Sequence, residues 1–466
     1  MSAGSKSKMQ GWWQRVVMPS DRVDQFHNAR IPATLLEPGA LRFWLAALFT
    51  GVGAGVSAII LTRLLEIVQH LTWAGSGTHI LEAATHADAW RRVLVPLEAG
   101  TIVVLGQLLL ARISSGNGID ITTALWFSAG RMPALRTLGS AFLSVIVVGM
   151  GASLGREGAP KQAGAVVANL LSDSGRLSDE QRRLLVACGA GAGMAAAYGV
   201  PLGGTLFALE VLRGMLALRL VLPALLASLV ASVIAWRVLP NAPTYNIPGF
   251  SYSDGALVLA LLIGPLAGLI AVGYVRMVAW ADRNKPTGWQ RWITPVTALG
   301  LLGLASIKFP QVLGNGRDLT QLLFTGGVTS SALLLLLFLL KPAATLLCLG
   351  SGTPGGLFTP SLTFGALLGG LMGSVAAHLG SGVPIGFCAL LGAGAMLAAT
   401  TQGPISSVVL MIELTGKDRS FIAPLLLAVI TATLVSRMIE PRSIYDARLS
   451  DEQVKARLQA REPSPQ

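Results

Sequence analysis

The sequence predicts an all-α polytopic membrane protein that is built from two homologous halves, and three features support this fold class. The chain is 52% hydrophobic and only 12% charged, whereas a soluble protein carries about 25% charged residues. Apolar segments recur that are long enough to cross a bilayer, which takes roughly 20 residues. The motifs of one half also return in the same order in the other half.

The apolar segments follow one another along most of the chain. The first covers residues 41–65, and comparable segments lie near 93–111, 184–212, 215–238, 255–280, 330–349, 386–415 and 421–436. A transmembrane β-barrel would instead show alternating hydrophobicity in segments of about 10 residues, a pattern that this sequence lacks. We therefore expect membrane-spanning helices.

Positive charge gathers at the two ends of the chain. The net charge is +12, and the basic residues before the first and after the last apolar segment are Lys6, Lys8, Arg15, Arg22, Arg30, Arg437, Arg442, Arg448, Lys455, Arg457 and Arg461. Because lysine and arginine are retained on the cytoplasmic side of membrane proteins, we expect both termini in the cytoplasm. The same rule accounts for the net charge without a nucleic-acid partner.

An internal repeat divides the apolar region into two. The stretch GAGAGMAAAYGVPLGGTLFALE (189–210) corresponds to GAGAMLAATTQGPISSVVLMIE (392–413) at an offset of 203 residues. Upstream, GREGAP (155–160) has its counterpart in GGLFTP (355–360). Each half thus contains a glycine-rich break, an apolar run, a GAGA helix, a proline and an apolar helix that ends in a glutamate.

The repeat and the charged ends together divide the chain into four parts. Residues 1–38 form a basic cytoplasmic segment, 39–240 and 241–440 form the two membrane halves, and 441–466 form a C-terminal segment with a short cytoplasmic tail. Repeated halves of membrane transporters commonly bind the substrate where their broken helices meet near the membrane midplane. We therefore expect the functional site between the two halves.

Three breaks that contain glycine and polar residues interrupt the apolar segments. They are SSGNGID (114–120), GREGAP (155–160) and SGTPGGLFTP (351–360). Irregular backbone is tolerated at membrane depth only where protein or a water-filled cavity satisfies its polar groups. Exposed N–H groups at a helix N-terminus form an anion site without a full positive charge, and such a site can release the ion again. The alternative is that these glycines only permit close helix packing.

These breaks resemble the motifs of the CLC family of chloride channels and chloride/proton antiporters. GREGAP is similar to the family motif GREGP, GGLFTP is similar to GxFxP, and GNGID stands where the family has GSGIP. SIY, which ends at Tyr445, resembles the late segment that carries the inner-gate tyrosine. The resemblance covers about residues 40–448. It implies that the halves are inverted, that their broken helices meet at the membrane midplane, and that the protein is a homodimer with a pore in each subunit.

The resemblance also implies roles for the motif residues. Glu157 would be the gating and proton-coupling glutamate, whose deprotonated carboxylate competes with the anion for backbone amides and whose protonated form moves away. The anion-binding residues would be Asn117, Gly158, Leu357, Phe358, Thr359 and Tyr445. Thr359 either adds its hydroxyl to the site or only caps its helix. The alternative for Glu157 is an ion pair with Arg156, but adjacent residues of a helix do not face each other, so we expect Arg156 to bind carbonyl groups or another partner.

Three positions depart from the pattern of the chloride transporters. Asn117 replaces the central serine of GSGIP, Asp120 replaces its proline, and Val211 stands where the family has its inner proton glutamate. This combination resembles the bacterial fluoride/proton antiporters of the family, and an amide offers two N–H donors to fluoride where a hydroxyl offers one. We therefore expect a fluoride/proton antiporter that exports fluoride across a bacterial inner membrane. The alternative is a chloride/proton antiporter or a passive chloride channel of the same fold.

The remaining polar residues suggest no catalytic site. Glu210 has Glu413 as its repeat partner, so we expect a structural role for it. A membrane serine protease is the competing class, because GASLG (151–155) matches G-x-S-x-G around Ser153, with His378 as the candidate base. That motif belongs on a strand-to-helix turn of a soluble α/β sheet, so we expect no enzyme. The five histidines are scattered and the three cysteines lie in apolar segments, so we expect no metal and no cofactor.

Overall fold

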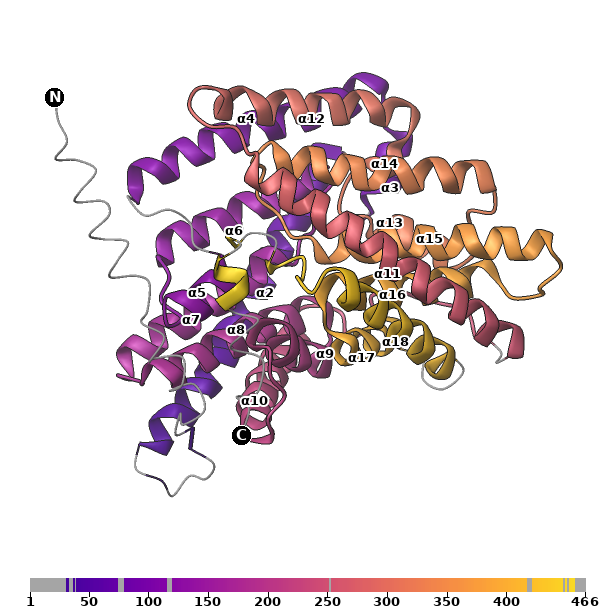
Figure 1. Cartoon of the computed structure of the whole chain (residues 1–466). Helices are drawn as coiled ribbons and strands as arrows, with labels where there is room; N and C mark the ends of the chain where they lie inside the picture. The colour runs from indigo at the N-terminus through magenta and orange to yellow at the C-terminus, as the bar shows by residue number, and fades with distance from the viewer. Residues whose placement is uncertain are drawn as a thin grey trace.

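The computed structural model describes residues 31–32, 37, 39–73, 79–114, 120–250, 253–416, 421–446, 449–450 and 452–456. The helices of the first half are α2 (Ala40–Trp73), α3 (Ile80–His86), α4 (Ala89–Ile113), α5 (Ile121–Phe127), α6 (Ala134–Gly149), α7 (Gly158–Ser174), α8 (Asp179–Tyr198), α9 (Pro201–Leu206), the π-helix η3 (Phe207–Arg213) and α10 (Leu218–Ala235). Those of the second half are α11 (Asp254–Arg283), α12 (Gln290–Lys308), the 3₁₀-helix η4 (Pro310–Val312), α13 (Arg317–Phe324), α14 (Ser331–Gly350), α15 (Phe358–His378), α16 (Ile385–Thr401), α17 (Pro404–Thr415) and α18 (Ile422–Ile439) (Figure 1).

Seven of the described helices are long and apolar enough to cross a membrane, namely α2, α4, α10, α11, α14, α15 and α18. Large apolar side chains on their outer faces are exposed, among them Phe49, Leu105, Leu269 and Leu339. Exposed leucines and phenylalanines at this density suit lipid as the surrounding solvent. The predicted all-α polytopic fold class is therefore confirmed.

Two of the predicted spans are wrong, because the segments 184–212 and 386–415 are each divided, the first into α8 and the α9–η3 segment and the second into α16 and α17. The first is divided at Gly199, which adopts a left-handed φ of +68°, and Pro201 begins the next helix. The second is divided at Gln402, with a φ of 59°, before Pro404. Proline suits the first position of a helix because its missing N–H would have no partner there.

The two halves repeat not only the order of their helices but also their packing. The α8 helix packs against α2, α7 and α10, and its equivalent α16 packs against α11, α15 and α18. A Cβ on Gly189 of α8 would lie 2.3 Å from the carbonyl oxygen of Gly164 of α7, and one on Gly392 of α16 would lie 2.3 Å from that of Gly365 of α15. These glycines thus do permit close helix packing. In Figure 1 the first half runs from indigo to magenta and the second from salmon to yellow, with α4 and α12 packed together at the top.

A reciprocal contact shows that the two halves are inverted. The Glu210 carboxylate, near the C-terminal end of the α9–η3 segment, accepts the backbone N–H groups of Ile405 and Ser406 at the start of α17, at 3.1 and 2.6 Å. Glu413, near the end of α17, accepts those of Leu202 and Gly203 at the start of α9, at 3.0 and 2.6 Å. Each C-terminal end therefore meets the other half's N-terminal end. Carboxylates are favourable at helix N-termini because they satisfy unpaired N–H groups and the helix dipole.

Glu210→Gln tests the structural role that these contacts give to Glu210. A neutral amide loses the charge-assisted character of two hydrogen bonds, so we expect the free energy of unfolding to fall by about 1–2 kcal/mol. Glu413→Gln should lower it by a similar amount. Thermal unfolding of the purified protein measures both, with Glu66→Gln as a control because Glu66 pairs only with the exposed Arg63. Well-folded Glu210→Gln protein with normal anion flux and no proton flux would instead make Glu210 the inner proton relay.

Candidate functional site

The two broken helices meet at one point between the halves. Gly155, just before α7, and Gly356, just before α15, exchange two backbone hydrogen bonds of 2.7 Å as an isolated antiparallel bridge. The α7 helix begins at Gly158 and α15 at Phe358, so both N-termini start at this bridge. Two helix N-termini at one place concentrate partial positive charge and N–H donors.

The Glu157 carboxylate lies at this point and is completely buried. The backbone N–H of Phe358 donates to its Oε1 at 2.7 Å, and the Thr359 hydroxyl donates to its Oε2 at 3.0 Å. The Tyr198 hydroxyl lies 3.4 Å from Oε2 and 3.0 Å from the Thr359 hydroxyl. Of the two roles open for Thr359, the structure therefore gives a hydroxyl that points into the site. A carboxylate bound in this way occupies donors that a free anion would use.

Two glycines border the space that holds the Glu157 carboxylate, which we call the carboxylate seat. A Cβ on Gly155 would lie 2.0 Å from Glu157 Oε1, and one on Gly356 would lie 2.2 Å from the same atom. Any other residue at either position would therefore displace the carboxylate. These glycines have the role of close backbone approach to a charged group, in contrast to the packing glycines of α7, α8, α15 and α16.

On one side of Glu157 lies the Arg156 pocket, which is lined by Arg156, Tyr198, Arg317 and Asp318 among others. The Arg156 guanidinium stacks over the Tyr198 ring at 5.0 Å from its centroid. The Tyr198 ring is thus the partner that the structure shows for the Arg156 side chain, in place of the Glu157 carboxylate or a set of carbonyl groups. Two guanidinium groups line the pocket, together with the carboxylates of Glu66 and Asp318.

A histidine–aspartate pair holds the rim of the Arg156 pocket. His79 Nδ1 lies 3.0 Å from Asp318 Oδ1, and the Leu81 backbone N–H donates to Asp318 Oδ2 at 3.0 Å. The hydrogen bond to Asp318 raises the pKa of His79. Burial alone would raise the pKa of Asp318, but the hydrogen bonds from His79 and Leu81 lower it. Asp318 thus stays ionised and joins α3 to α13.

On the other side of Glu157 lies a smaller pocket, the Tyr445 pocket. It is lined by Asp120, Ile121, Thr122, Gly158, Lys161, Gln162, Leu212, Gly355, Gly356, Leu357, Ile444 and Tyr445. Asp120, Gly158, Gln162 and Gly355 also line a wider vestibule that holds Arg136, Lys285 and Arg291. Glu157 contacts Tyr198, which lines the Arg156 pocket, and its carboxylate lies against Gly356, which lines the Tyr445 pocket.

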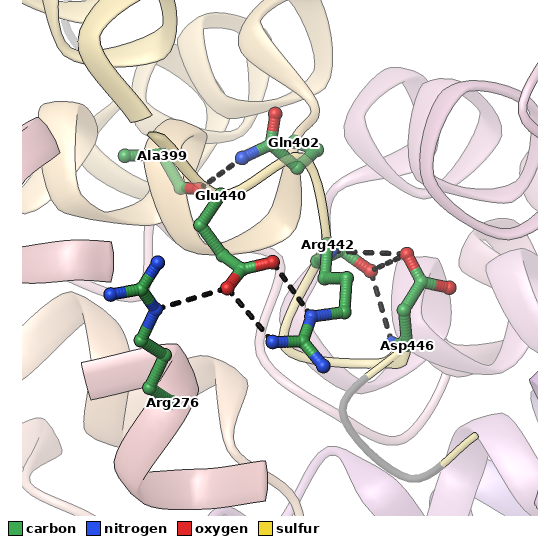
Figure 2. Close-up of polar contacts among 7 residues, drawn as sticks. Arg276, Ala399, Gln402, Glu440, Arg442 and Asp446 are labelled. Carbon is green, nitrogen blue, oxygen red and sulfur yellow. Dashed lines mark hydrogen bonds and ion pairs between the residues drawn. The ribbon is translucent and has the colours of Figure 1, made fainter. Parts of the chain in front are cut away.

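The segment that carries Tyr445 is anchored through Glu440 (Figure 2). Arg276 Nε of α11 donates to Glu440 Oε2 at 3.1 Å, and Arg442 Nε donates to Oε1 at 2.6 Å. The hydrogen bond from Arg442 lowers the pKa of Glu440 against the opposing effect of burial, and the one from Arg276 lowers it further. The ionised Glu440 thus ties the end of α18 to α11.

Two further contacts fix the turn that follows. Asp446 Oδ2 accepts the N–H and the hydroxyl of Ser443 at 3.0 and 2.7 Å, and the Ile444 N–H donates to the Thr400 carbonyl at 2.7 Å. The Asp446 turn is visible in Figure 2. Tyr445 is therefore presented to its pocket by a rigid segment.

Three features from the sequence analysis remain, namely Asn117, Asp120 and the Ser153–His378 pair of the competing protease interpretation. Asn117 is outside the described residues. Asp120 is the N-cap of α5, where its Oδ2 accepts the Thr122 N–H at 3.1 Å, so local structure explains this departure from the family motif. The proposed protease pair is not assembled, because the Ser153 hydroxyl contacts Thr345 and His378 Nδ1 contacts the Ser374 carbonyl.

Sequence reasoning missed Lys161, Tyr198 and Phe207. Lys161 places a full positive charge beside the two helix N-termini, where the sequence predicted an anion site without one, with its Nζ 3.3 Å from the Tyr445 hydroxyl. A lysine four residues after Glu157 in an apolar run was a visible signal. Phe207 had no sequence signal, since it is one apolar residue among many.

The chain is similar to known proteins along most of its length. The profile of the family described as Voltage gated chloride channel matches residues 98–437. A putative chloride channel protein, ClcB-like, from Ralstonia nicotianae is 32% identical over 416 residues, which are 85% of this chain and 94% of that protein. This chain belongs to the CLC family of voltage-gated chloride channels.

Solved structures of CLC proteins share the fold. A slow cyanobacterial Cl⁻/H⁺ antiporter matches with a TM-score of 0.76 and 22% identity, over 91% of this chain and 100% of that one. A CLC-type fluoride/proton antiporter matches with a TM-score of 0.69 and 24% identity, over 87% of this chain and 97% of that one. At these identities the likeness establishes the CLC fold. The protein is thus an anion transporter or channel of the CLC type.

Gly155→Ala tests the carboxylate seat. The new Cβ would fill the space of the carboxylate, so we expect anion flux to fall by about tenfold or more, since overpacking costs about 1–3 kcal/mol. Efflux from liposomes, followed with an ion-selective electrode, measures it. Gly273→Ala on α11 is the matched control, because its Cβ would meet nothing within 4 Å. Wild-type flux in Gly155→Ala would show that the seat is not on the anion path.

Proposed function

We propose that this CLC protein exchanges an anion for protons and that Glu157 couples the two. The observation that carries the proposal is the buried Glu157 carboxylate, which accepts the Phe358 N–H at 2.7 Å and contacts residues that line the two pockets. Intramembrane acids are functional candidates by default, because their burial is costly without a purpose. The Arg156 pocket and the Tyr445 pocket would be the two ends of the path.

The coupling follows from competition for the same donors. An ionised carboxylate and a free anion cannot both bind the Phe358 N–H, so anion entry expels the carboxylate. Once expelled, the carboxylate loses its charge-assisted hydrogen bonds and binds a proton more readily. The protonated side chain no longer competes with the anion, and its later deprotonation returns it to the seat. One side chain thereby links each anion passage to proton movement.

Fluoride is the anion that we propose, with export from the cytoplasm as the direction. Support comes from Asn117 in place of a serine, from Val211 in place of an inner glutamate, and from the shared fold of the fluoride/proton antiporter. Chloride is the second candidate, as substrate of a proton antiporter or a passive channel. The ClcB-like relative and the Cl⁻/H⁺ antiporter favour it, as does the structural role of Asp120 at the start of α5.

We further propose a homodimer in a bacterial inner membrane, with both termini in the cytoplasm. The division into residues 39–240 and 241–440 as membrane halves belongs to this proposal. Leu202 of α9 and Ile405 of α17 are 53% and 50% exposed on adjacent helices, which suits either lipid or a second subunit. Orientation in the membrane rests on the positive charges at the two ends of the chain.

Glu157→Gln tests the coupling role. The amide resembles a protonated carboxyl and cannot bind or release the coupled proton, so we expect proton movement to disappear while anion flux persists. Simultaneous recording of anion efflux and proton uptake in liposomes measures both. Glu82→Gln is the matched control, since Glu82 is exposed on α3 and lines none of these pockets. A Glu157→Gln protein that still drives protons uphill on an anion gradient would exclude the role.

Asn117→Ser tests the choice of anion. The substitution removes the amide donors, so we expect the flux of chloride relative to fluoride to rise by up to about tenfold, the effect of one hydrogen bond to an ion. Parallel chloride and fluoride efflux assays measure the ratio. An unchanged ratio would assign selectivity to other residues of the path.

A further inference from the structure

Lys161 is a buried cation that lies along the proposed anion path. The proposed function gives this residue no role. It lies on α7, and its backbone N–H donates to the Glu157 carbonyl one turn earlier at 3.4 Å. Residues four apart lie on the same face of a helix, so Lys161 follows Glu157 along one side of α7. It is only 5% exposed and lines the Tyr445 pocket together with Gly158 and Gly356.

Two aromatic rings hold the Lys161 ammonium in place. Its Nζ lies 4.9 Å from the centroid of the Phe207 ring and 4.8 Å from that of the Tyr445 ring, and it donates to the Tyr445 hydroxyl at 3.3 Å. The two rings meet edge to face at 5.6 Å. Burial of an ammonium is costly without compensation, and cation–π contacts offset part of this cost. The charge is thus fixed in position at a point where the protein has excluded most water.

The same rings connect Lys161 to the carboxylate seat. The Phe207 ring packs edge to face against Phe358 at 6.4 Å between centroids, and Phe358 supplies the N–H that binds Glu157. The Phe207 ring therefore lies between the Lys161 ammonium and Phe358, whose backbone N–H binds the Glu157 carboxylate. In this low-dielectric setting a full charge acts on a nearby ion far more strongly than it would in water.

We propose that the Lys161 ammonium binds the transported anion in the Tyr445 pocket and sets the anion affinity on that side of Glu157. This inference rests on the proposed anion path. The anion would bind beside Lys161 while Glu157 occupies the seat, and would move to the Phe358 N–H when Glu157 leaves. An ammonium carries three N–H donors and a full charge, which suits a strongly hydrated ion better than neutral amides alone.

A full positive charge raises the question of how the anion is released. Asp120 lines the same pocket, and its carboxylate is held there as the N-cap of α5. Its negative charge reduces the potential that Lys161 imposes on the pocket, so binding stays reversible, as transport requires. Lys161 and Asp120 together would therefore determine the affinity and not Lys161 alone.

The test is a titration of purified protein with sodium fluoride and with sodium chloride by isothermal calorimetry. Lys161→Met keeps the length of the side chain and removes the charge, and we expect it to weaken the binding of the transported anion by roughly tenfold or more. Lys161→Arg keeps the charge and should bind within a few-fold of wild type. Lys308→Met is the matched control, because Lys308 is exposed at the end of α12, lies 5.7 Å from the Phe309 ring centroid and lines none of these pockets.

Two outcomes would overturn the inference. Unchanged affinity in Lys161→Met would mean that the ammonium only fills space between the rings. Unchanged affinity with loss of proton movement in liposomes would make Lys161 a proton carrier instead. Should Lys161→Met fail to fold, Lys161→Gln gives the same comparison, since its amide retains a donor for Tyr445. The titration needs no proton gradient, so failure of coupling in the wild-type protein leaves this result readable.

Discussion

The hydrogen bond from the Phe358 backbone N–H to the Glu157 carboxylate is the interaction on which the site depends. It joins the first half of the protein to the second, and in the proposed mechanism it closes the ion path and uses a donor that the anion would need. Its geometry requires that two chain breaks cross closely, which the reciprocal bridge between Gly155 and Gly356 achieves. In the proposed mechanism the carboxylate and the anion are alternatives at this donor, because both are negative ions that would bind the same N–H group.

Inversion of the two halves is what brings these donors together. Because the halves run in opposite directions, the N-termini of α7 and α15 point toward one place rather than to opposite faces. The Glu210 and Glu413 contacts stabilise the same inverted arrangement at α9 and α17. Anion chemistry at the centre and helix capping at the periphery thus use the same property, the affinity of helix N-termini for negative charge.

The sequence was sufficient for the fold and for the backbone part of the site. Charge content, recurrent apolar segments and the repeat predicted an α-helical membrane protein with two halves, and GREGAP and GGLFTP predicted where they meet. Helix ends were harder, because Gly199 and Gln402 break helices inside runs that are apolar throughout. Lys161 and Phe207 could not be placed by pattern, since their proximity to Tyr445 comes from the packing of α7, η3 and the end of the chain. The fluoride interpretation depends on Asn117, which lies outside the described residues, while Asp120 is the N-cap of α5.

The most direct test of the account is proton uptake on anion binding by the purified protein in weakly buffered detergent solution. The central claim is that the anion displaces the ionised Glu157 carboxylate from the Phe358 N–H, after which the carboxylate takes up a proton. Addition of sodium fluoride or sodium chloride should therefore raise the pH of a wild-type solution and leave that of Glu157→Gln unchanged. Proton uptake that stays absent in the wild-type protein even at anion concentrations that saturate binding would contradict the competition between carboxylate and anion.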